Sequence, residues 1–491
     1  MIATILGRAG FAGRLRYFLW IRYRVRFIQI SLVAMTLAFT LAGALLMGSN
    51  LLLGLLPVLG FVGVFAVIAL YYRMEYAALM ILLVSLLLQE GVSTGTATKI
   101  TFTFITLALV SGIWIFQLIF VKSARKIRPS PANIPAVIFI ITVIISLIWS
   151  TLYVDYAVSY RYAENVKPRL MSTVAFILSP MAYLLYANLV RSDRGIRFFV
   201  TTYLVISGVI IFMRLFSTVP PLLNDDGQIP VWTVTLATGQ LLFNRNLKRW
   251  VQLSLLVIIA LWSYNQFGLG ITWLSGWLPL ALSLGVLVFF RSWKVFLFAV
   301  MVVSFVLLLN AASVTETLNA ENDESGHTRT DAWRVVLELT DDHILFGVGP
   351  TGYAPYLWTY VGDFMATHNN YLDMLSQLGI VGFLMFVWFW LSILWVAWRT
   401  FLIAPRTGFY YGLSAALVAT CLVTLLISAL GDWIIPFAYT QGISGIDYTI
   451  WSWMLAGLTV SVHYHIRSLA ERQKESPQLM PAGALPAPLK A

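Results

Sequence analysis

Charged side chains are scarce in this sequence. Asp, Glu, Lys and Arg make up 11% of the 491 residues, whereas hydrophobic residues make up 59%. Soluble domains keep roughly a quarter of their residues charged, so this composition excludes a globular protein whose whole surface faces water. The apolar residues are gathered in runs of about 20, and each such run is long enough to cross a membrane as a helix.

Cysteine is almost absent, since Cys421 inside an apolar run is the only one. A single cysteine excludes an intrachain disulfide and a zinc site built from several thiolates. The net charge of +11 does not indicate nucleic-acid binding, because the basic residues lie in short clusters between the apolar runs. No internal repeat of fixed period is visible either.

The apolar runs predict an all-α, polytopic integral membrane protein with about 12–14 transmembrane helices and one large structured periplasmic loop. The runs 229–244 and 250–264 are short, so twelve full spans with re-entrant pieces are the alternative to fourteen. The predicted spans are 27–47, 51–72, 76–92, 100–121, 133–150, 171–189, 198–216, 229–244, 250–264, 267–290, 295–314, 371–398, 408–431 and 448–466.

The distribution of charge sets the orientation of these spans. Most of the 32 Lys and Arg residues fall in alternate connections, and most of the 21 acidic residues fall in the others. The positive-inside rule therefore places both termini in the cytoplasm. The predicted regions are a basic cytoplasmic N-terminus (1–26), helices 1–11 (27–314), a periplasmic loop (315–370), helices 12–14 (371–466) and a disordered cytoplasmic tail (467–491).

The large periplasmic loop contains the start and end signals of a short helix. Thr328 is a suitable N-cap, Asp331 falls in the first turn, and Trp333 begins an apolar pattern with helical spacing. We predict an amphipathic helix over 329–340 that lies on the membrane surface and ends at Asp341 and Asp342.

Glycine and histidine follow this helix in a fixed order. Gly347 and Gly349 form a tight turn in which the backbone can approach a ligand. His368 and Asn369 then open the next span, and the pair Gly379 and Gly382 predicts close helix packing there.

This order of residues resembles the O-antigen ligase/polymerase superfamily. The resemblance covers Arg329 and Trp333, the Gly347–Gly349 turn, and His368-Asn369 followed after nine residues by a Gly-x-x-Gly pair. It implies a glycosyltransferase of the bacterial inner membrane that acts on the periplasmic face without a metal or other cofactor. The implied partners are a glycan donor linked to undecaprenyl diphosphate or a similar polyprenyl diphosphate, a glycan or lipid acceptor, and membrane lipids, with no nucleic acid. Both a ligase and a polymerase fit this pattern.

The resemblance also implies roles for single residues. His368 would act as the base, because histidine changes its protonation near neutral pH. Arg329 would stabilise the departing diphosphate, since a guanidinium binds phosphate oxygens in a fork. The other candidates for diphosphate binding are Arg214, Arg334 and Arg161. The residues predicted to support the site are Asn369, Gly347, Gly349, Gly379 and Gly382.

One family feature has no counterpart. Family members carry a second arginine in a Ser-Arg-Gly-like stretch before the large loop, whereas residues 273–277 read Trp-Leu-Ser-Gly-Trp. Arg214, which stands at the outer end of its apolar run, is one replacement for this arginine, and Arg161 or Arg169 is another. An ionisable group at such a depth indicates function by default.

Simpler interpretations compete with these roles. Each arginine can also bind lipid headgroups, and His368 can be a hydrogen-bonded residue at a helix start. The acidic pairs Asp225-Asp226 and Asp341-Asp342 lack a third ligand for Mg²⁺. The alternative functions are a transporter or flippase for lipid-linked sugars, which would place ionisable groups in the middle of several spans, and a structural scaffold.

Overall fold

The computed structural model describes residues 71–93, 99–121, 127–164, 166–270, 274–309, 315, 327–362, 366–437, 439 and 442–475. The chain divides into two compact units, Met1–Arg73 and Met74–Ala491, and the description below concerns the second. The predicted region 1–26, the spans 27–47 and 51–72, and the end of the tail from 476 lie outside the described residues.

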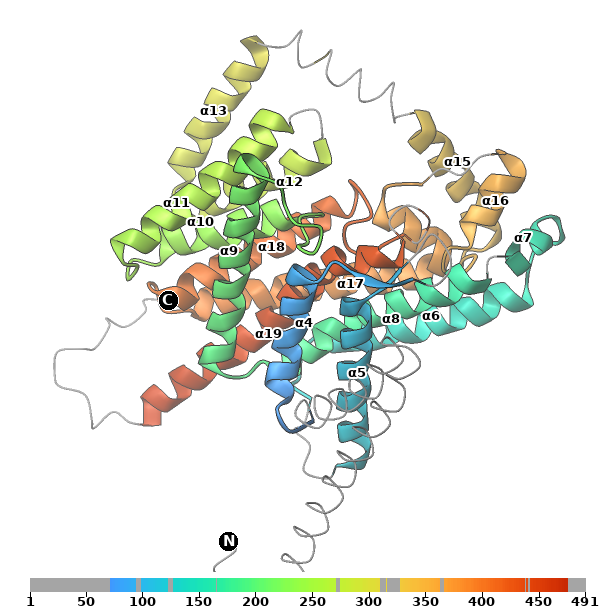
Figure 1. Ribbon diagram of the computed structural model, residues 1–491, viewed down its shortest axis with the longest axis horizontal. Helices are drawn as coiled ribbons and strands as arrows, with labels where there is room; N and C mark the ends of the chain where they lie inside the picture. The colour runs from blue at the N-terminus through green and yellow to red at the C-terminus, as the bar shows by residue number, and fades with distance from the viewer. Residues whose placement is uncertain are drawn as a thin grey trace, which may run out of the picture. The chain divides into compact units, whose positions relative to one another are not determined.

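Helices form nearly all of the regular structure that is described (Figure 1), which confirms the all-α class. The elements before residue 265 are α4 (Met74–Leu87), β1 (Gly91–Ser93), β2 (Lys99–Thr101), α5 (Phe102–Phe120), α6 (Asn133–Leu152), η1 (Tyr156–Val158), α7 (Ser159–Glu164), α8 (Val166–Leu189), α9 (Asp193–Phe216), α10 (Ile229–Phe243) and α11 (Arg249–Ser263). The later elements are η2 (Tyr264–Leu269), α12 (Leu274–Arg291), α13 (Trp293–Leu309), α15 (His327–Asp342), α16 (Tyr353–Tyr360), α17 (Asn370–Ile403), α18 (Phe409–Ile427), η4 (Ile443–Gly445) and α19 (Ile446–Glu475).

Among the described residues, 8 helices are long and apolar enough to cross a membrane, and α4, α10 and part of α13 are shorter apolar helices. The predicted short span 250–264 is wrong in length, because the π-helical turn η2 continues α11 into one helix over Arg249–Leu269. The predicted span 76–92 ends earlier, at Leu87, and the chain then forms the strand β1, which pairs antiparallel with β2 and places Gly91 opposite Thr101.

The helices α8 and α18 lie at the centre of the unit. In each of them 78% of the apolar window is buried, compared with 22% for the helix Arg249–Leu269 at the surface. Small residues let the central helices approach one another: a side chain at Gly457 of α19 would touch Tyr183 and Tyr186 of α8, and one at Gly239 of α10 would overlap with α18. Without water to drive helices together, this close packing stabilises a membrane bundle.

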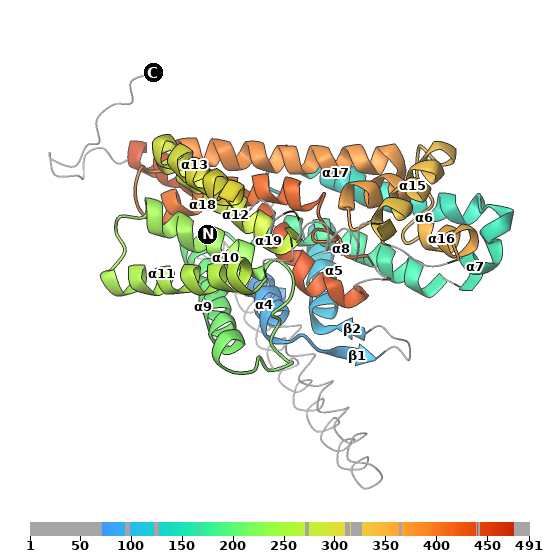
Figure 2. The same cartoon turned by 90° about the horizontal axis from the view of Figure 1, so that it is seen from above.

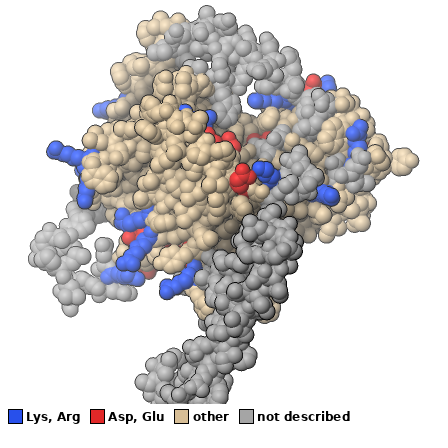
Figure 3. Space-filling view, in the orientation of Figure 1, with Lys and Arg blue, Asp and Glu red and all other residues tan. Residues whose placement is uncertain are grey.

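Contacts between connections agree with the predicted alternation of the spans. Connections predicted on the cytoplasmic side contact one another, as in the pairs Glu75–Ser192, Arg128–Ser461 and Asp193–Tyr410. Connections predicted on the outer side do the same, as in the pairs Gln89–Asp226, Tyr360–Asp155 and Thr101–Asp447. A group of Lys and Arg side chains lies where α9 begins and α19 ends, at the lower left of Figure 3.

The helix predicted over 329–340 is longer than expected. It runs as α15 from His327 to Asp342, so Thr328 lies inside the helix and is not its N-cap. Its buried apolar side chains Val335, Val336 and Leu339 pack in one cluster with residues of α16. Figures 1 and 2 both show α7, α15 and α16 together at one end of α6 and α17.

The first part of the region predicted to be a disordered tail, 467–491, is helical. Helix α19 continues through the start of this region to Glu475, where Arg467 and Glu471 form an ion pair of 3.5 Å with the spacing of one helical turn. Such pairs and the strong helix-forming residues around them extend the helix beyond the apolar run.

Candidate active site

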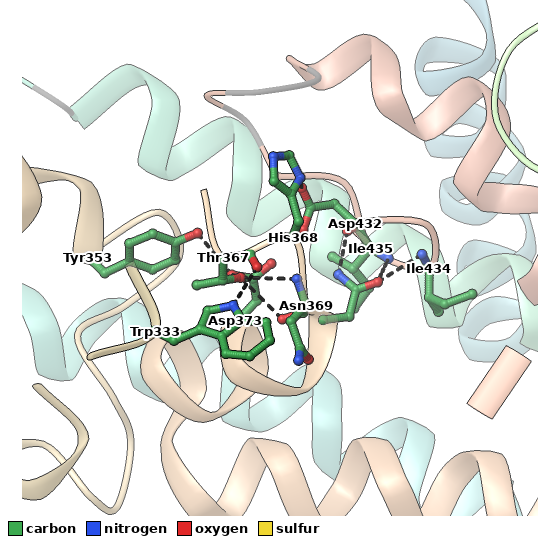
Figure 4. A network of polar contacts seen from close by, with 10 residues as sticks. Trp333, Tyr353, Thr367, His368, Asn369, Asp373, Asp432, Ile434 and Ile435 are labelled. Atoms are coloured by element: carbon green, nitrogen blue, oxygen red, sulfur yellow. Dashed lines mark hydrogen bonds and ion pairs between the residues drawn. The ribbon is translucent and has the colours of Figure 1, made fainter. Parts of the chain in front are cut away.

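His368 lies in a strained turn at the start of α17. Its φ angle is +47°, in the left-handed region that residues other than glycine adopt rarely. Asn369 follows as the N-cap of α17, because its side-chain oxygen accepts the N–H groups of Tyr371 (3.0 Å) and Leu372 (3.3 Å). The turn points the imidazole ring of His368 away from the side chains of Trp333 and Asp373 (Figure 4), and 41% of this side chain is exposed.

Asp432 contacts the ring of His368 from the connection between α18 and α19. The carboxylate oxygen Oδ2 is 3.3 Å from Nδ1, and the Asp432 side chain is fully buried. This contact favours the tautomer that carries its proton on Nδ1, which leaves Nε2 to accept a proton. The sequence analysis did not propose Asp432, although an ionisable residue directly after an apolar span was a signal for it.

Asn370 holds the connection that carries Asp432. Its side-chain N–H donates to the carbonyl of Ile435 at 2.9 Å, and its side-chain oxygen accepts the N–H of Ile434 at 2.9 Å. Its own N–H donates to the carbonyl of Ser428 at 2.7 Å. Asn370 therefore holds the connection between α18 and α19, which is distant in sequence, and these hydrogen bonds bring Asp432 to His368.

Asp373 lies behind this pair and is also buried. Its oxygen Oδ1 accepts the hydroxyls of Thr367 (2.7 Å) and Tyr353 (2.9 Å), and its carboxyl interacts directly with that of Asp432. Burial, together with the nearby carboxyl groups of Asp373 and Asp432, raises the pKa of Tyr353 well above its usual range, so the phenol keeps its proton and donates.

Trp333 connects α15 to the same turn. Its indole N–H donates to the carbonyl of Thr367 at 2.7 Å. Arg329 precedes Trp333 by four residues and therefore lies on the same face of α15, one turn away. The Nε atom of Arg329 is buried and has no hydrogen-bond partner among the described residues, and no ion pair joins its side chain to any of them. Among the described residues Arg329 is thus a cation without an ion-pair partner, one helical turn from the tryptophan that contacts the His368 turn.

The glycine turn joins α17 through its backbone. Gly347 and Gly349 both have positive φ angles, and the N–H groups of Val348 and Gly349 donate to the carbonyls of Ser376 (2.8 Å) and Gln377 (3.0 Å). Those carbonyls are available because Gly379, at φ +68°, breaks the helix. Gly379 and Gly382 were predicted to permit helix packing, but Gly379 is needed for this break, and a side chain at Gly382 would overlap with Leu378 of the same helix.

The predicted phosphate-binding arginines lie apart from one another. Arg334 is exposed and pairs with Asp331 at 3.6 Å, and Arg214 pairs with Asp225 at 3.5 Å near the end of α9. Arg161 is exposed on α7. The ion pairs of Arg334 and Arg214 are therefore with acidic residues of their own segments, whereas His368 pairs with Asp432.

Arg169 is the arginine that the structure brings to the glycine turn. Its side chain is 5% exposed and donates to the Ser150 hydroxyl at 2.6 Å. A side chain at Gly349 would overlap with Ser150 and come within 3.4 Å of the guanidinium. The sequence analysis considered Arg169 only as one replacement for the missing arginine, because periodicity gives no measure of burial at a helix start.

The acidic pairs do not assemble a metal site among the described residues, where no three His, Cys, Asp or Glu side chains lie close enough to hold an ion. Asp225 pairs with Arg214 through its backbone carbonyl at 3.1 Å as well as through its carboxylate. Partial burial raises the pKa of Asp225, and the charge of Arg214 opposes this shift.

No curated protein matches the chain. A family model described as O-antigen ligase matches residues 249–387, a range that contains Arg329, the glycine turn and His368 but ends before Asp432. The match confirms, over these residues, the resemblance of the chain to the O-antigen ligase superfamily.

Proposed function

We propose that the protein is a membrane glycosyltransferase of the O-antigen ligase/polymerase type. It moves a glycan from a polyprenyl-diphosphate carrier, such as undecaprenyl diphosphate, to an acceptor hydroxyl on the outer face of the bacterial inner membrane. The observation that carries this proposal is the exposed imidazole of His368, which buried Asp432 contacts at 3.3 Å, together with Arg329 of α15, whose side chain has no ion-pair partner among the described residues. The family match supports a glycosyltransferase-type enzyme.

His368 is the base in this reaction. Its Nε2 takes the proton of the acceptor hydroxyl while the acceptor oxygen forms a bond to the anomeric carbon of the donor glycan. The bond from this carbon to the diphosphate oxygen breaks, and both of its electrons leave with the diphosphate. Asp432 stabilises the imidazolium that forms, because its carboxylate faces Nδ1 at 3.3 Å.

The departing diphosphate needs positive charge at the membrane boundary. Arg329 is the best-placed residue, because it shares a helix face with Trp333, which contacts the His368 turn. Arg214, Arg161 and Arg334 remain candidates for a second contact, since each reaches the surface on the predicted outer side. Arg169 holds the glycine turn from inside the protein.

The position of the buried charges favours an enzyme over a transporter. The fully buried charged residues in the described part of the chain are Arg169, Asp373, Asp432 and Asp447. All four lie at the predicted outer ends of helices or in an outer connection. A pathway for a charged substrate would need such groups at the middle of the spans.

Glycan transfer by purified variants in proteoliposomes tests the proposal. The donor is the lipid-linked oligosaccharide pool extracted from the native membranes, and the measured product is free polyprenyl diphosphate. His368→Asn suits the test, because asparagine tolerates a positive φ angle. We expect it to lower the rate by about 100-fold or more, the scale of general-base catalysis.

The matched control is His343→Asn, which changes another histidine of the same outer segment; its partner is Tyr356 at 3.3 Å. This control should keep its rate within a few-fold. Unchanged transfer by folded His368→Asn protein would exclude the histidine as the base.

A further inference from the structure

Asp373 joins four separate segments around His368. It lies in the first turn of α17 and is 1% exposed. Its oxygen Oδ1 accepts the hydroxyl of Tyr353 from α16 and that of Thr367 from the histidine turn. Its carboxyl also contacts Asp432 of the connection after α18, and Figure 4 shows all four side chains in one cluster.

We propose that Asp373 is a positioning residue that works in its protonated form, donating a hydrogen bond to Asp432 while it holds the Thr367–His368 turn. This inference rests on the proposed role of His368 as the base. Asp373 does not touch the substrate, and it acts by fixing two groups: the backbone that presents the imidazole and the carboxylate that orients it.

The charges of the cluster favour one proton between the two carboxyls. Two buried carboxylates in contact repel each other strongly when both are ionised. Asp432 faces the ring that becomes an imidazolium, so the negative charge is most favourable on Asp432. Asp373 accepts two neutral hydroxyls on Oδ1, which leaves Oδ2 to carry the proton toward Asp432.

The proposal predicts different activities for two variants of Asp373 whose new side chains are of similar size. Asp373→Asn keeps a carbonyl oxygen for Thr367 and Tyr353 and offers an N–H to Asp432, so it imitates the protonated acid. Asp373→Leu removes all of these contacts. We expect Asp373→Asn to keep kcat within about threefold and Asp373→Leu to lower kcat tenfold or more with an unchanged KM for the lipid-linked donor.

The control is Asp447→Asn. Asp447 is an equally buried acid at the start of α19, and its Oδ1 accepts the hydroxyl of Thr101. It should keep its kcat. A purely structural role for Asp373 predicts loss of folded protein in both Asp373 variants, without rescue by asparagine. Folding is measured by the protection of the single, buried Cys421 from a thiol reagent.

Two results would overturn the inference. One is a folded Asp373→Asn protein with a kcat reduced tenfold or more, which would mean that the ionised form is required. The other is full activity of Asp373→Leu. If the leucine variant does not fold, Thr367→Val replaces it, because it removes only the hydroxyl that bonds Asp373; full kcat in this variant would then refute the proposal.

The failure of this inference is distinguishable from that of the proposed function. If His368→Asn retains transfer, the base assignment is wrong whatever Asp373 does. If His368→Asn loses transfer while Asp373→Leu does not, only the role of Asp373 is wrong. In the His368→Asn background, Asp373→Leu should cause no further loss, because both changes act through the same imidazole.

Discussion

Replacing Gly379 by alanine should loosen the connection between α17 and the glycine turn. At φ +68° an alanine costs about 1–2 kcal/mol, because its side chain crowds the backbone in this region. Its Cβ would also overlap with the carbonyl group of Leu345, which must then move away. This shift weakens the bond from the Ile380 N–H to the Ile344 carbonyl, now 2.7 Å, at a cost of about 1 kcal/mol.

The total destabilisation expected for Gly379→Ala is therefore about 3–5 kcal/mol once the displaced backbone is included. The chain offers a matched control in Gly362, which has a φ of +84° but would place a Cβ with no described atom within 4 Å. Gly362→Ala should show only the conformational cost of about 1–2 kcal/mol.

Thermal unfolding in nanodiscs measures the difference, with a thiol-reactive dye that reports the exposure of Cys421. This residue is the only cysteine of the chain, and it is 2% exposed in the folded protein. We expect a clearly lower unfolding temperature for Gly379→Ala than for Gly362→Ala. Equal unfolding temperatures for the two variants would refute the argument that the break in α17 needs a glycine because of the Leu345 carbonyl.

Four further substitutions test the arginines and the indole. Arg169→Ala should lower both stability and transfer, since it removes a buried contact of 2.6 Å to Ser150, whereas exposed Arg161→Ala should leave stability within about 0.5 kcal/mol. Arg214→Ala should cost less than about 1 kcal/mol near neutral pH, because its pair with Asp225 is exposed. This loss of stability should shrink as the pH falls, because a protonated Asp225 no longer forms an ion pair with the arginine. Burial raises the pKa of Asp225, so its protonation begins at a higher pH than that of an exposed carboxyl group. Unfolding curves at several pH values measure this trend. Trp333→Phe should keep the packing of α15 but lower kcat by about five- to tenfold, because Thr367 loses the N–H bonded to its carbonyl at 2.7 Å; an unchanged kcat would mean that the turn is held without it.

The positions of the apolar helices were the most predictable part of the molecule. Apolar runs and charge clusters are local properties, so they located helices such as α6, α9 and α18 within a few residues. Errors arose where local signals were overridden. The π-helical turn over Tyr264–Leu269 lengthened a span that had seemed too short. The paired strands β1 and β2 follow α4 directly, and this span is shorter than predicted.

The candidate site was predictable only where its residues follow one another in sequence. The glycine turn, His368 and Arg329 belong to one ordered stretch, which the family match also covers. Asp432 and Arg169 come from distant segments, and their contacts with this stretch depend on tertiary packing. No periodicity in a sequence can show that the Asn370 side chain bonds Ile435 and thereby brings Asp432 to the histidine.

The strain at His368 explains why so many contacts surround it. A left-handed histidine costs about 1–3 kcal/mol, so the turn persists only if its neighbours fix both sides. Thr367 is fixed by Trp333 and Asp373, and Asn369 is fixed by the first N–H groups of α17. The carbonyl of Thr367 accepts the indole N–H of Trp333 on α15, the helix that also carries Arg329. The contacts that hold the proposed base therefore also hold the helix that carries the proposed phosphate-binding arginine.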